Sequence, residues 1–433
     1  MNAQADDAAL IRDIARRYDP FGTALLDDPY PFFAEARAAT PAFFSEPLQH
    51  WVITRHADVR DVLRNTTLYS AANTLETLKP LCPYARQVLI EGAVRPPPAL
   101  TNNDPPSHTR ARRIANAAFT PRRVAQMEDF IRATTRQFIT ERFRDGRADL
   151  IRDLAWELPA LVIFNVIGLS DDEVHRIKAA AQNRLLFNWG FPTDEEQTEL
   201  ARDTVALWHF IQAFVERRAE NPGEDFTSDL LRGRDENAGG LSQGEACSVL
   251  LALLVAGHET TTSLIGNAVR WLLRDRSHWD AVRQDPTRLP NAIEEVLRIE
   301  PSIHTWRRRS LAPVRFGDVD IPAGANLLLL IGAANHDPAV FADPDQFDIA
   351  RTNAREHLSF GHGAHICLGA PLARLEARVV LEELGRAFPD LTIDPDWQMQ
   401  VLPTLSFRGP AELPVSWHHG PRKEAQAMKG LAR

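Results

Sequence analysis

The chain has 433 residues, of which 44% are hydrophobic and 25% are charged, the composition of an ordinary soluble globular protein. Its formal net charge of −9 argues against a nucleic-acid partner, because phosphate binding normally requires a basic surplus. The N-terminus is too polar for a secretory signal and no apolar run reaches the roughly 18–20 residues of a membrane span, so we expect a cytoplasmic protein without a membrane partner.

The first quarter of the chain predicts a mixed region. Residues 1–19 are polar and charged, and we expect them to form a flexible N-terminal segment. Residues 51–54 predict a short strand, with a neighbouring sheet edge at 42–44. Residues 71–106 are rich in proline and lack a sustained period, which predicts a long irregular connection of the kind that is usually functional.

Helical spacing dominates the next part of the chain. It extends over residues 120–218, with a break at 190–192 and an end at the Asn-Pro-Gly of 221–223. A long helix is predicted over 242–274, opened by a serine with a glutamate three residues later, the pattern of a capping box.

That long helix carries the motif Ala256-Gly257-His258-Glu259-Thr260-Thr261. The motif is short, and taken alone it favours a structural explanation over a functional one: Gly257 would permit close helix packing and Glu259 would be exposed to solvent. His258 lies roughly 100° around the helix from each neighbour, so we expect it to be structural rather than catalytic.

A further helix opened by Pro290 carries Glu295 and Arg298, whose spacing of three residues places them on one face as an ion pair. Strands follow at 314–321 and 326–331, with a turn between them. The fold class is therefore mostly α with small β-sheets (α+β), and no linker interrupts residues 20–419, which predict a single domain.

The most informative segment is the glycine-rich loop at 360–369, which contains Cys367 and leads into a helix over 371–386. A lone intracellular cysteine is most often a small core residue. A helix N-terminus stabilises a thiolate by only roughly 0.3–1 kcal/mol, too little to ionise a thiol, whereas a metal ion can. The tail at 420–433 has few apolar residues and is expected to be flexible.

The loop Phe360-Gly361-His362-Gly363-Ala364-His365-Ile366-Cys367-Leu368-Gly369 resembles the haem-binding signature of the cytochrome P450 family. The resemblance implies the cytochrome P450 fold, with haem b held between the long helix and the cysteine loop. It makes Cys367 the iron ligand, with Phe360, Gly361 and Gly369 shaping the loop around it.

The same resemblance gives roles to the other motifs. Ala256 and Gly257 would lie over the haem, Thr260 would hydrogen-bond dioxygen, and Glu259 would relay protons. A loosened helical ladder at Gly257 would open a pocket for dioxygen.

Two sets of charged residues gain a function from the resemblance. Arg351 would join Glu295 and Arg298 in a buried trio that serves folding and haem retention. The haem propionates would be held by His108, Arg112, Arg308 and His365, although Arg307 or Arg309 could replace Arg308 after a shift of one residue.

Within the family, the likeness is greatest to the haem domains of bacterial self-sufficient members fused to a phthalate-type reductase. Three cysteines cannot supply an iron–sulfur cluster, and the chain has no complete dinucleotide fingerprint, so electrons from NAD(P)H would arrive through a separate ferredoxin and ferredoxin reductase. A basic stretch would suit an acidic ferredoxin, or would simply be a solvated face; its members are Arg110, Arg112, Arg113, Arg122 and Arg123.

By position in the family, the substrate pocket is expected to be largely apolar, with no arginine pair aimed inward to hold a carboxylate. Its expected lining residues are Phe187, Trp189, Phe191, Val255, Ala256, Ile303, Thr305, Thr404 and Leu405. The predicted activity is insertion of one oxygen atom from O2 into a small apolar substrate, by hydroxylation or oxidative dealkylation. A peroxygenase driven by hydrogen peroxide and a non-enzymatic haem sensor are the alternatives.

Overall fold

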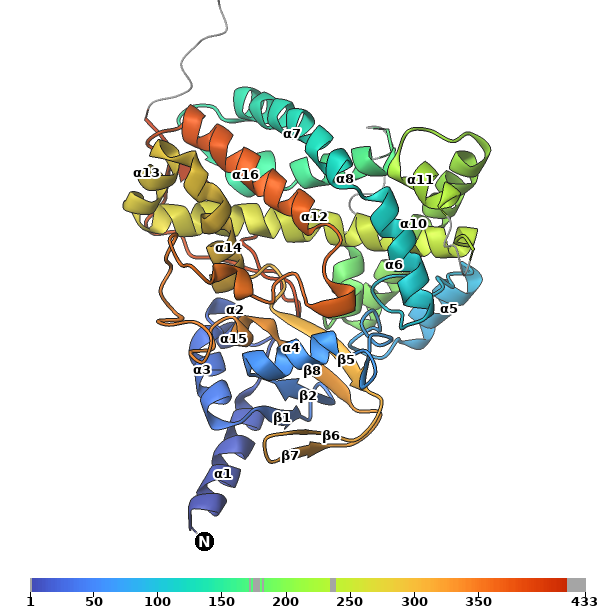
Figure 1. Cartoon of the computed structure of the whole chain (residues 1–433), viewed down its shortest axis with the longest axis vertical. Coiled ribbons are helices and arrows are strands. Elements are labelled where there is room, and N and C mark those ends of the chain that lie inside the picture. Colours follow the sequence, from blue (N-terminus) through green and yellow to red (C-terminus); the bar gives the residue numbers. More distant parts are fainter. Residues whose placement is uncertain (1, 171–172, 174–179, 181–182, 234–238, 419–433) are drawn as a thin grey trace, which may run out of the picture.

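The structure is a computed structural model that describes residues 2–170, 173, 180, 183–233 and 239–418. It combines a helix-rich part with a smaller sheet-containing part, as Figure 1 shows with the long helix α12 crossing the helical part above the sheet. The predicted fold class, mostly α with small β-sheets, is confirmed.

The helices of the first half of the chain are α1 (Asn2–Arg17), α2 (Thr23–Asp27), α3 (Tyr30–Ala39), α4 (His56–Arg64), α5 (Pro83–Glu91), α6 (Ser107–Ala118), α7 (Pro121–Arg142), the π-helical turn η1 (Ile151–Ala155), α8 (Leu158–Ile167) and α10 (Asp194–Glu220). The second half contains α11 (Phe226–Arg232), α12 (Gln243–Arg274), α13 (Arg276–Gln284), η2 (Pro286–Arg288), α14 (Leu289–Ile299), α15 (Ile331–Ala334), η3 (Ala354–Glu356), η4 (Gly363–His365) and α16 (Ala370–Ala387).

The strands of the described residues form three sheets. The largest has the order β1-β2-β8-β5-β3, in which β2 and β8 are parallel and the other neighbours are antiparallel. Its members are β1 (Ala42–Ser45), β2 (His50–Ile53), β3 (Tyr69–Ser70), β5 (Thr305–Ser310) and β8 (Asn326–Leu330). The smaller sheets are β4-β10-β9, from Arg147–Asp149, Pro414–Ser416 and Thr392–Ile393, and the hairpin β6-β7, from Val314–Phe316 and Val319–Ile321.

Helix α12 is the central element of the core. It begins with the predicted capping box: the Ser242 side chain accepts from the Glu245 amide, and the Glu245 side chain accepts from the Ser242 amide. Helices α8, α10 and α16 pack against it, and α16 in turn packs on α7, as their side-by-side course in Figure 1 indicates. By length and composition α12 could cross a membrane, but 61% of its most apolar window is buried inside the protein, as expected of a core helix.

Two predictions about the N-terminal region need correction. Residues 2–17 form helix α1, where a flexible segment was expected, because Ile14 is fully buried and Tyr18 packs on Phe43. Within the predicted irregular stretch 71–106, helix α5 begins at Pro83 and packs against α10.

Two predictions about strands also need correction. The predicted strand at 314–321 is a two-strand hairpin that turns at Gly317, whose φ is +54°. Strand β5 was not predicted, because its Thr-Trp-Arg-Arg-Arg-Ser sequence lacks the apolar alternation of a half-buried strand. The predicted tail at 420–433 lies outside the described residues.

Candidate active site

A cavity of about 440 Å³ lies between α12 and the cysteine loop. It is bounded by segments far apart in the sequence, including β5, the helical residues 183–189 and part of the 71–106 connection. Its walls are mostly apolar. The predicted catalytic and cofactor-binding residues that line it are Arg112, Ala256, Gly257, Thr260, Arg308, Phe360, Gly361, His365, Cys367 and Gly369.

The cysteine loop is held by main-chain geometry. The Cys367 amide donates to the Phe360 carbonyl oxygen at 2.8 Å, and Gly361 has a φ of +72°, which favours glycine. Gly363 has a φ of +73°, and a Cβ there would lie 2.9 Å from the Arg64 Cα. Gly369 is different, because a Cβ at that position would make an ordinary 3.9 Å contact with the Cys367 sulfur. Gly361 and Gly363 therefore fix the loop shape.

Cys367 is exposed to the space of the cavity that it lines. Burial raises the pKa of its thiol, and this effect is only partly opposed by the amides of Gly369 and Ala370 and by the charge of Arg112. The protein alone therefore does not ionise the thiol, as the small effect of a helix end predicts.

Helix α12 contributes its motif to the cavity wall. Thr260 donates its hydroxyl hydrogen to the Ala256 carbonyl at 2.6 Å, and Glu259 is buried next to it. The helix continues without a break through Gly257, where we expected a loosened ladder. A Cβ at Gly257 would lie 2.9 Å from Ile163, so this glycine permits the close packing of α8.

His258 is directed away from the cavity. Its Nε2 lies 2.7 Å from the Trp156 carbonyl oxygen, at the end of the π-helical turn η1. This contact is consistent with the structural role expected for it.

A cluster of basic side chains borders the cavity near the cysteine loop. The rings of His108 and His365 lie 3.9 Å apart, and the charges of Arg112 and Arg308 act on both. Burial and these arginines lower the pKa of His108 to about 4 and that of His365 to about 3. Three ring nitrogens have no hydrogen-bond partner among the described residues: Nδ1 and Nε2 of His108 and Nε2 of His365.

The alternation of strand β5 distinguishes the three consecutive arginines. Successive strand residues face opposite sides, and Trp306 and Arg308 line the cavity. Arg307 does not line the cavity; its guanidinium carbon lies 4.0 Å from the Trp189 ring centre, and the side chain donates to the Thr74 carbonyl at 2.9 Å. Arg309 pairs with Glu76 at 2.9 Å. Arg308 is therefore the member of this group that can reach a ligand in the cavity.

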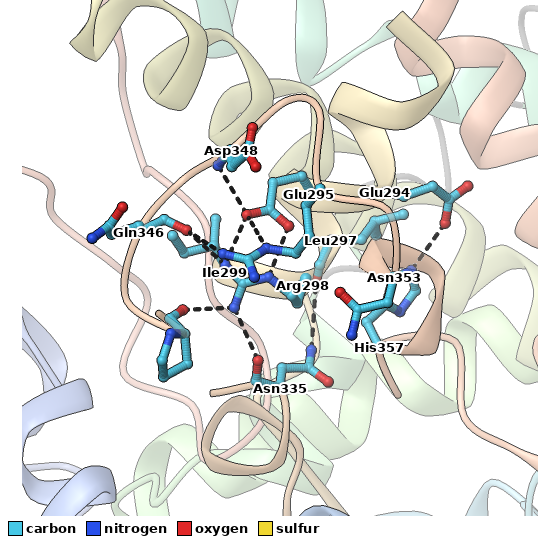
Figure 2. A network of polar contacts seen from close by, with 12 residues as sticks. Glu294, Glu295, Leu297, Arg298, Ile299, Asn335, Gln346, Asp348, Asn353 and His357 are labelled. Carbon is cyan, nitrogen blue, oxygen red and sulfur yellow. Dashed lines mark hydrogen bonds and ion pairs between the residues drawn. The ribbon is translucent and has the colours of Figure 1, made fainter. Parts of the chain in front are cut away.

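The trio of Glu295, Arg298 and Arg351 is assembled as the resemblance implies. Arg298 donates two hydrogen bonds of 2.8 Å to the Glu295 carboxylate, and the Arg351 Nε donates to it at 3.0 Å. The remaining donors of Arg298 reach main-chain carbonyls of Asn335, Pro344 and Gln346, a network shown in Figure 2. Both Glu295 and Arg298 are 0% exposed, so every charge here is paired inside the protein.

Four of the expected pocket residues line the cavity: Trp189, Val255, Ala256 and Ile303. The other five lie elsewhere, and this corrects the predicted lining. Phe187 packs with Cys82 and Ala85, and Phe191 is 57% exposed against Phe21. The remaining three are turned into the protein around the segment at 402–407: Thr305, Thr404 and Leu405.

Sequence reasoning missed Arg184, which lines the cavity in the segment before Trp189. Its neighbours along the chain are largely apolar, so a single cation between Asn183 and Leu185 was the available signal. It also missed Phe407 and Trp306 in the cavity wall.

The residues of the cavity fit a flat, anionic, iron-bearing ligand. A thiol that needs a metal for ionisation faces the cavity, and a nearby cluster of cations and unpartnered imidazoles can bind carboxylates. The fold and the site together are those of the haem-thiolate class of proteins.

Comparisons with known proteins agree with this assignment to the haem-thiolate class. A cytochrome P450 family model matches residues 85–400. The erythromycin C-12 hydroxylase of Saccharopolyspora erythraea is 35% identical over 377 residues, which cover 87% of this chain and 91% of that protein. The chain belongs to the cytochrome P450 family, and it is a monooxygenase of that family.

Two solved structures illustrate the likeness. Cytochrome P450 CREJ in complex with (4-ethylphenyl) dihydrogen phosphate is 37% identical, with a TM-score of 0.89 and coverage of 93% of this chain and 100% of that one. The CYP116B5 haem domain of Acinetobacter radioresistens is 33% identical, with a TM-score of 0.89 and coverage of 95% and 100%. The predicted likeness to haem domains of self-sufficient members is confirmed, since such domains are among the matched structures.

Proposed function

We propose that this cytochrome P450 inserts one oxygen atom from O2 into a small substrate with an apolar body, by hydroxylation or oxidative dealkylation. The observation that carries the proposal is that the Cys367 sulfur and the Thr260 hydroxyl line one mostly apolar cavity. Bound haem b, held by Cys367 and by the basic cluster defined above, supplies the dioxygen and one-electron chemistry.

The residues of α12 supply proton chemistry. The Thr260 hydroxyl has its hydrogen on the Ala256 carbonyl, so its oxygen remains available to accept a hydrogen bond within the cavity. Rotation of the hydroxyl would let it donate instead. Glu259, buried on the same helix, is the group we propose to deliver protons to that position.

Electrons are proposed to come from NAD(P)H through a separate ferredoxin and ferredoxin reductase in the cytoplasm. The basic stretch offers a smaller docking surface than its sequence suggests, because Arg110 pairs with Glu245 and Arg123 pairs with Asp229. Arg122, which is exposed, supports docking of an acidic partner.

The substrate body is proposed to lie against Val255, Ala256 and Ile303, which limit it to a small aromatic or aliphatic group. CREJ, which is similar over nearly the whole chain, has been solved with an alkylphenyl phosphate, a compound with such a body.

A peroxygenase remains the second candidate function, since it would use the same thiolate. The presence of both Glu259 and Thr260 favours the dioxygen-dependent reaction, because a peroxide-driven enzyme has no need of this pair.

The test is a screen of purified haem-loaded protein with alkylbenzenes, aromatic ethers and terpenes, read as a substrate-induced shift of the Soret band. Compounds that shift the band are then incubated with O2, ferredoxin, reductase and NAD(P)H. The proposal predicts a monooxygenated product whose yield depends on the reductase. Product formed with peroxide alone, and none with the electron-transfer proteins, would favour the peroxygenase.

A further inference from the structure

The cavity contains a second, separate cationic position. Arg184 lines it together with Leu185, Asn188 and Trp189. These residues are spaced one, four and five positions after Arg184 in the helical stretch 183–189, so they share the face that borders the cavity.

The protein supplies few hydrogen-bond or ion-pair partners for the charged side chain of Arg184. Among the described residues, its hydrogen bond is from Nη1 to the Thr204 hydroxyl at 3.0 Å, which uses one of five N–H donors. Its guanidinium carbon lies 5.7 Å from the Phe187 ring centre. No carboxylate of the described residues pairs with it, whereas most of the other arginines that lie away from the surface have an acidic or main-chain acceptor.

Burial lowers the pKa of Arg184 to about 10. The side chain therefore keeps its charge at neutral pH. An isolated cation is unfavourable in such surroundings unless a counter-ion binds to it.

The other charged residues of the cavity do not serve as that counter-ion. Glu76 is paired with Arg309 at 2.9 Å, and burial raises the pKa of Glu376 well above its usual range, which disfavours its charged form. Arg112 and Arg308 act on the two histidines near the cysteine loop. The propionates of bound haem would use the cluster by the loop and leave Arg184 for another ligand.

We propose that Arg184 binds an anionic group of the substrate, so that the preferred substrates are small molecules with an apolar body and one carboxylate or phosphate monoester. This inference rests on the function proposed above and specifies its substrate class. The planar guanidinium can hold either oxyanion through two parallel hydrogen bonds, while the apolar walls near Val255 hold the body beside Thr260. The anion thus fixes the orientation that an apolar lining leaves undetermined.

The test uses matched probes that differ only in charge: 4-propylbenzoate against 4-propylbenzamide, and 4-propylphenyl phosphate against 4-propylphenol. Binding to the haem-loaded protein is measured by the Soret shift and, for probes that leave the band unchanged, by equilibrium dialysis. We expect at least one anion to bind roughly tenfold or more tightly than its neutral counterpart, because a charge-assisted hydrogen bond adds to the same apolar contacts. Preference for the benzoate or for the phosphate identifies which oxyanion the site takes.

Three variants complete the experiment. Arg184→Met should abolish the preference for the anion while leaving the affinity for the neutral probe unchanged, which also shows that the variant is folded. Arg184→Lys should retain part of the preference. Arg202→Met, which removes a surface arginine paired with Glu199, should behave like the unmodified protein.

The proposal is overturned if no anion binds more tightly than its neutral counterpart, or if the preference survives in Arg184→Met. Failure of the proposed function has a different signature, because it would appear as a protein without a haem-thiolate spectrum, or as one that binds the probes and never oxidises them.

Discussion

Two buried groups of charges in this protein differ in whether the protein itself supplies a partner for each charge. Around Glu295, Arg298 and Arg351, every charged atom has a partner inside the protein, either another side chain or a main-chain carbonyl. Around the cavity, Arg184 has no acidic partner and the His108 ring has no hydrogen-bond partner among the described residues.

The difference separates structural charges from ligand-binding ones. Desolvation of an ion costs several kcal/mol, and a fold that meets this cost with its own groups uses the charges for its stability. A buried charge whose desolvation is not offset by the protein lies where a ligand can supply the partner. By this criterion the trio maintains the fold, and the cavity residues bind haem and substrate.

The largest expected effect comes from breaking the fully paired group. Arg298→Met leaves the buried Glu295 carboxylate without its main partner and should lower the free energy of unfolding by about 3–5 kcal/mol. Urea unfolding measures this, with Arg315→Met as the control, because Arg315 and Asp320 form an ion pair on the surface and are 64% and 70% exposed. The control should lose less than about 1 kcal/mol. Equal losses in the two variants would contradict the distinction.

A slightly smaller effect is expected at Glu294, next to the trio. Burial alone would raise the pKa of this carboxyl, but hydrogen bonds from His357 and from Arg374 outweigh it and lower the pKa to about 2. Since the folded-state pKa lies below the ordinary value of 4.5, this group stabilises the fold above pH 4.5, and the contribution is lost as the pH falls towards 2.

Glu294→Gln should therefore lower the unfolding free energy near neutral pH by about 2–3 kcal/mol. It should also make stability less sensitive to pH between 4.5 and 2. Unfolding curves recorded across this pH range measure both quantities. If the variant lost stability between pH 4.5 and 2 as steeply as the unmodified protein, another group would be responsible for that loss.

The proposed role of Thr260 in the cavity is tested by measuring catalysis. In Thr260→Ala, electron consumption should continue while the product yield falls by roughly tenfold and hydrogen peroxide accumulates, because the proton delivery that directs electrons into product is impaired. Product, peroxide and NAD(P)H are measured together. Thr140→Ala is the control, since Thr140 donates to the Arg136 carbonyl oxygen at 2.8 Å with the same four-residue spacing but lies on an exposed surface. Unchanged product yield in Thr260→Ala would rule out the proposed role.

The smallest expected effect is at Arg112, and it separates ligand-binding charges from structural ones most clearly. Arg112→Gln should accelerate haem loss by about fivefold, which corresponds to roughly 1 kcal/mol. The haem-free protein should be no less stable than the unmodified one, because within the described part of the chain Arg112 pairs with the neutral Asn116 and has no acidic partner to lose. Haem transfer to apomyoglobin measures the first effect and thermal unfolding of the haem-free protein measures the second. Destabilisation of the haem-free variant would place Arg112 with the structural charges.

Residues within contiguous motifs were predictable from the sequence. The cysteine loop, the Glu259-Thr260 pair and the spacing of Glu295 and Arg298 are local patterns, and the structure brings the loop and helix α12 to one cavity as expected. Local patterns are informative because the loop turn at Gly361 and the helical spacing depend on neighbouring residues.

Residues whose role depends on side-chain direction were predicted less well. Phe187 was expected in the pocket, but it packs against Cys82 and Ala85, whereas Trp189, two residues later and roughly 200° around the helix axis, lines the cavity. Thr305 failed for the same reason, because strand β5 was not predicted and its alternation directs Trp306 and Arg308 to the cavity. Without the boundaries and the rotation of an element, its inward face cannot be deduced.

The most direct test of the account is the absorption spectrum of the reduced, haem-loaded protein exposed to carbon monoxide. If the Cys367 sulfur is the anionic ligand of the iron, the Soret band shifts to the long-wavelength position typical of thiolate ligation, and this band is lost in Cys367→His. A spectrum typical of a nitrogen or neutral thiol ligand, or a purified protein that takes up no haem, would contradict the assignment of the site.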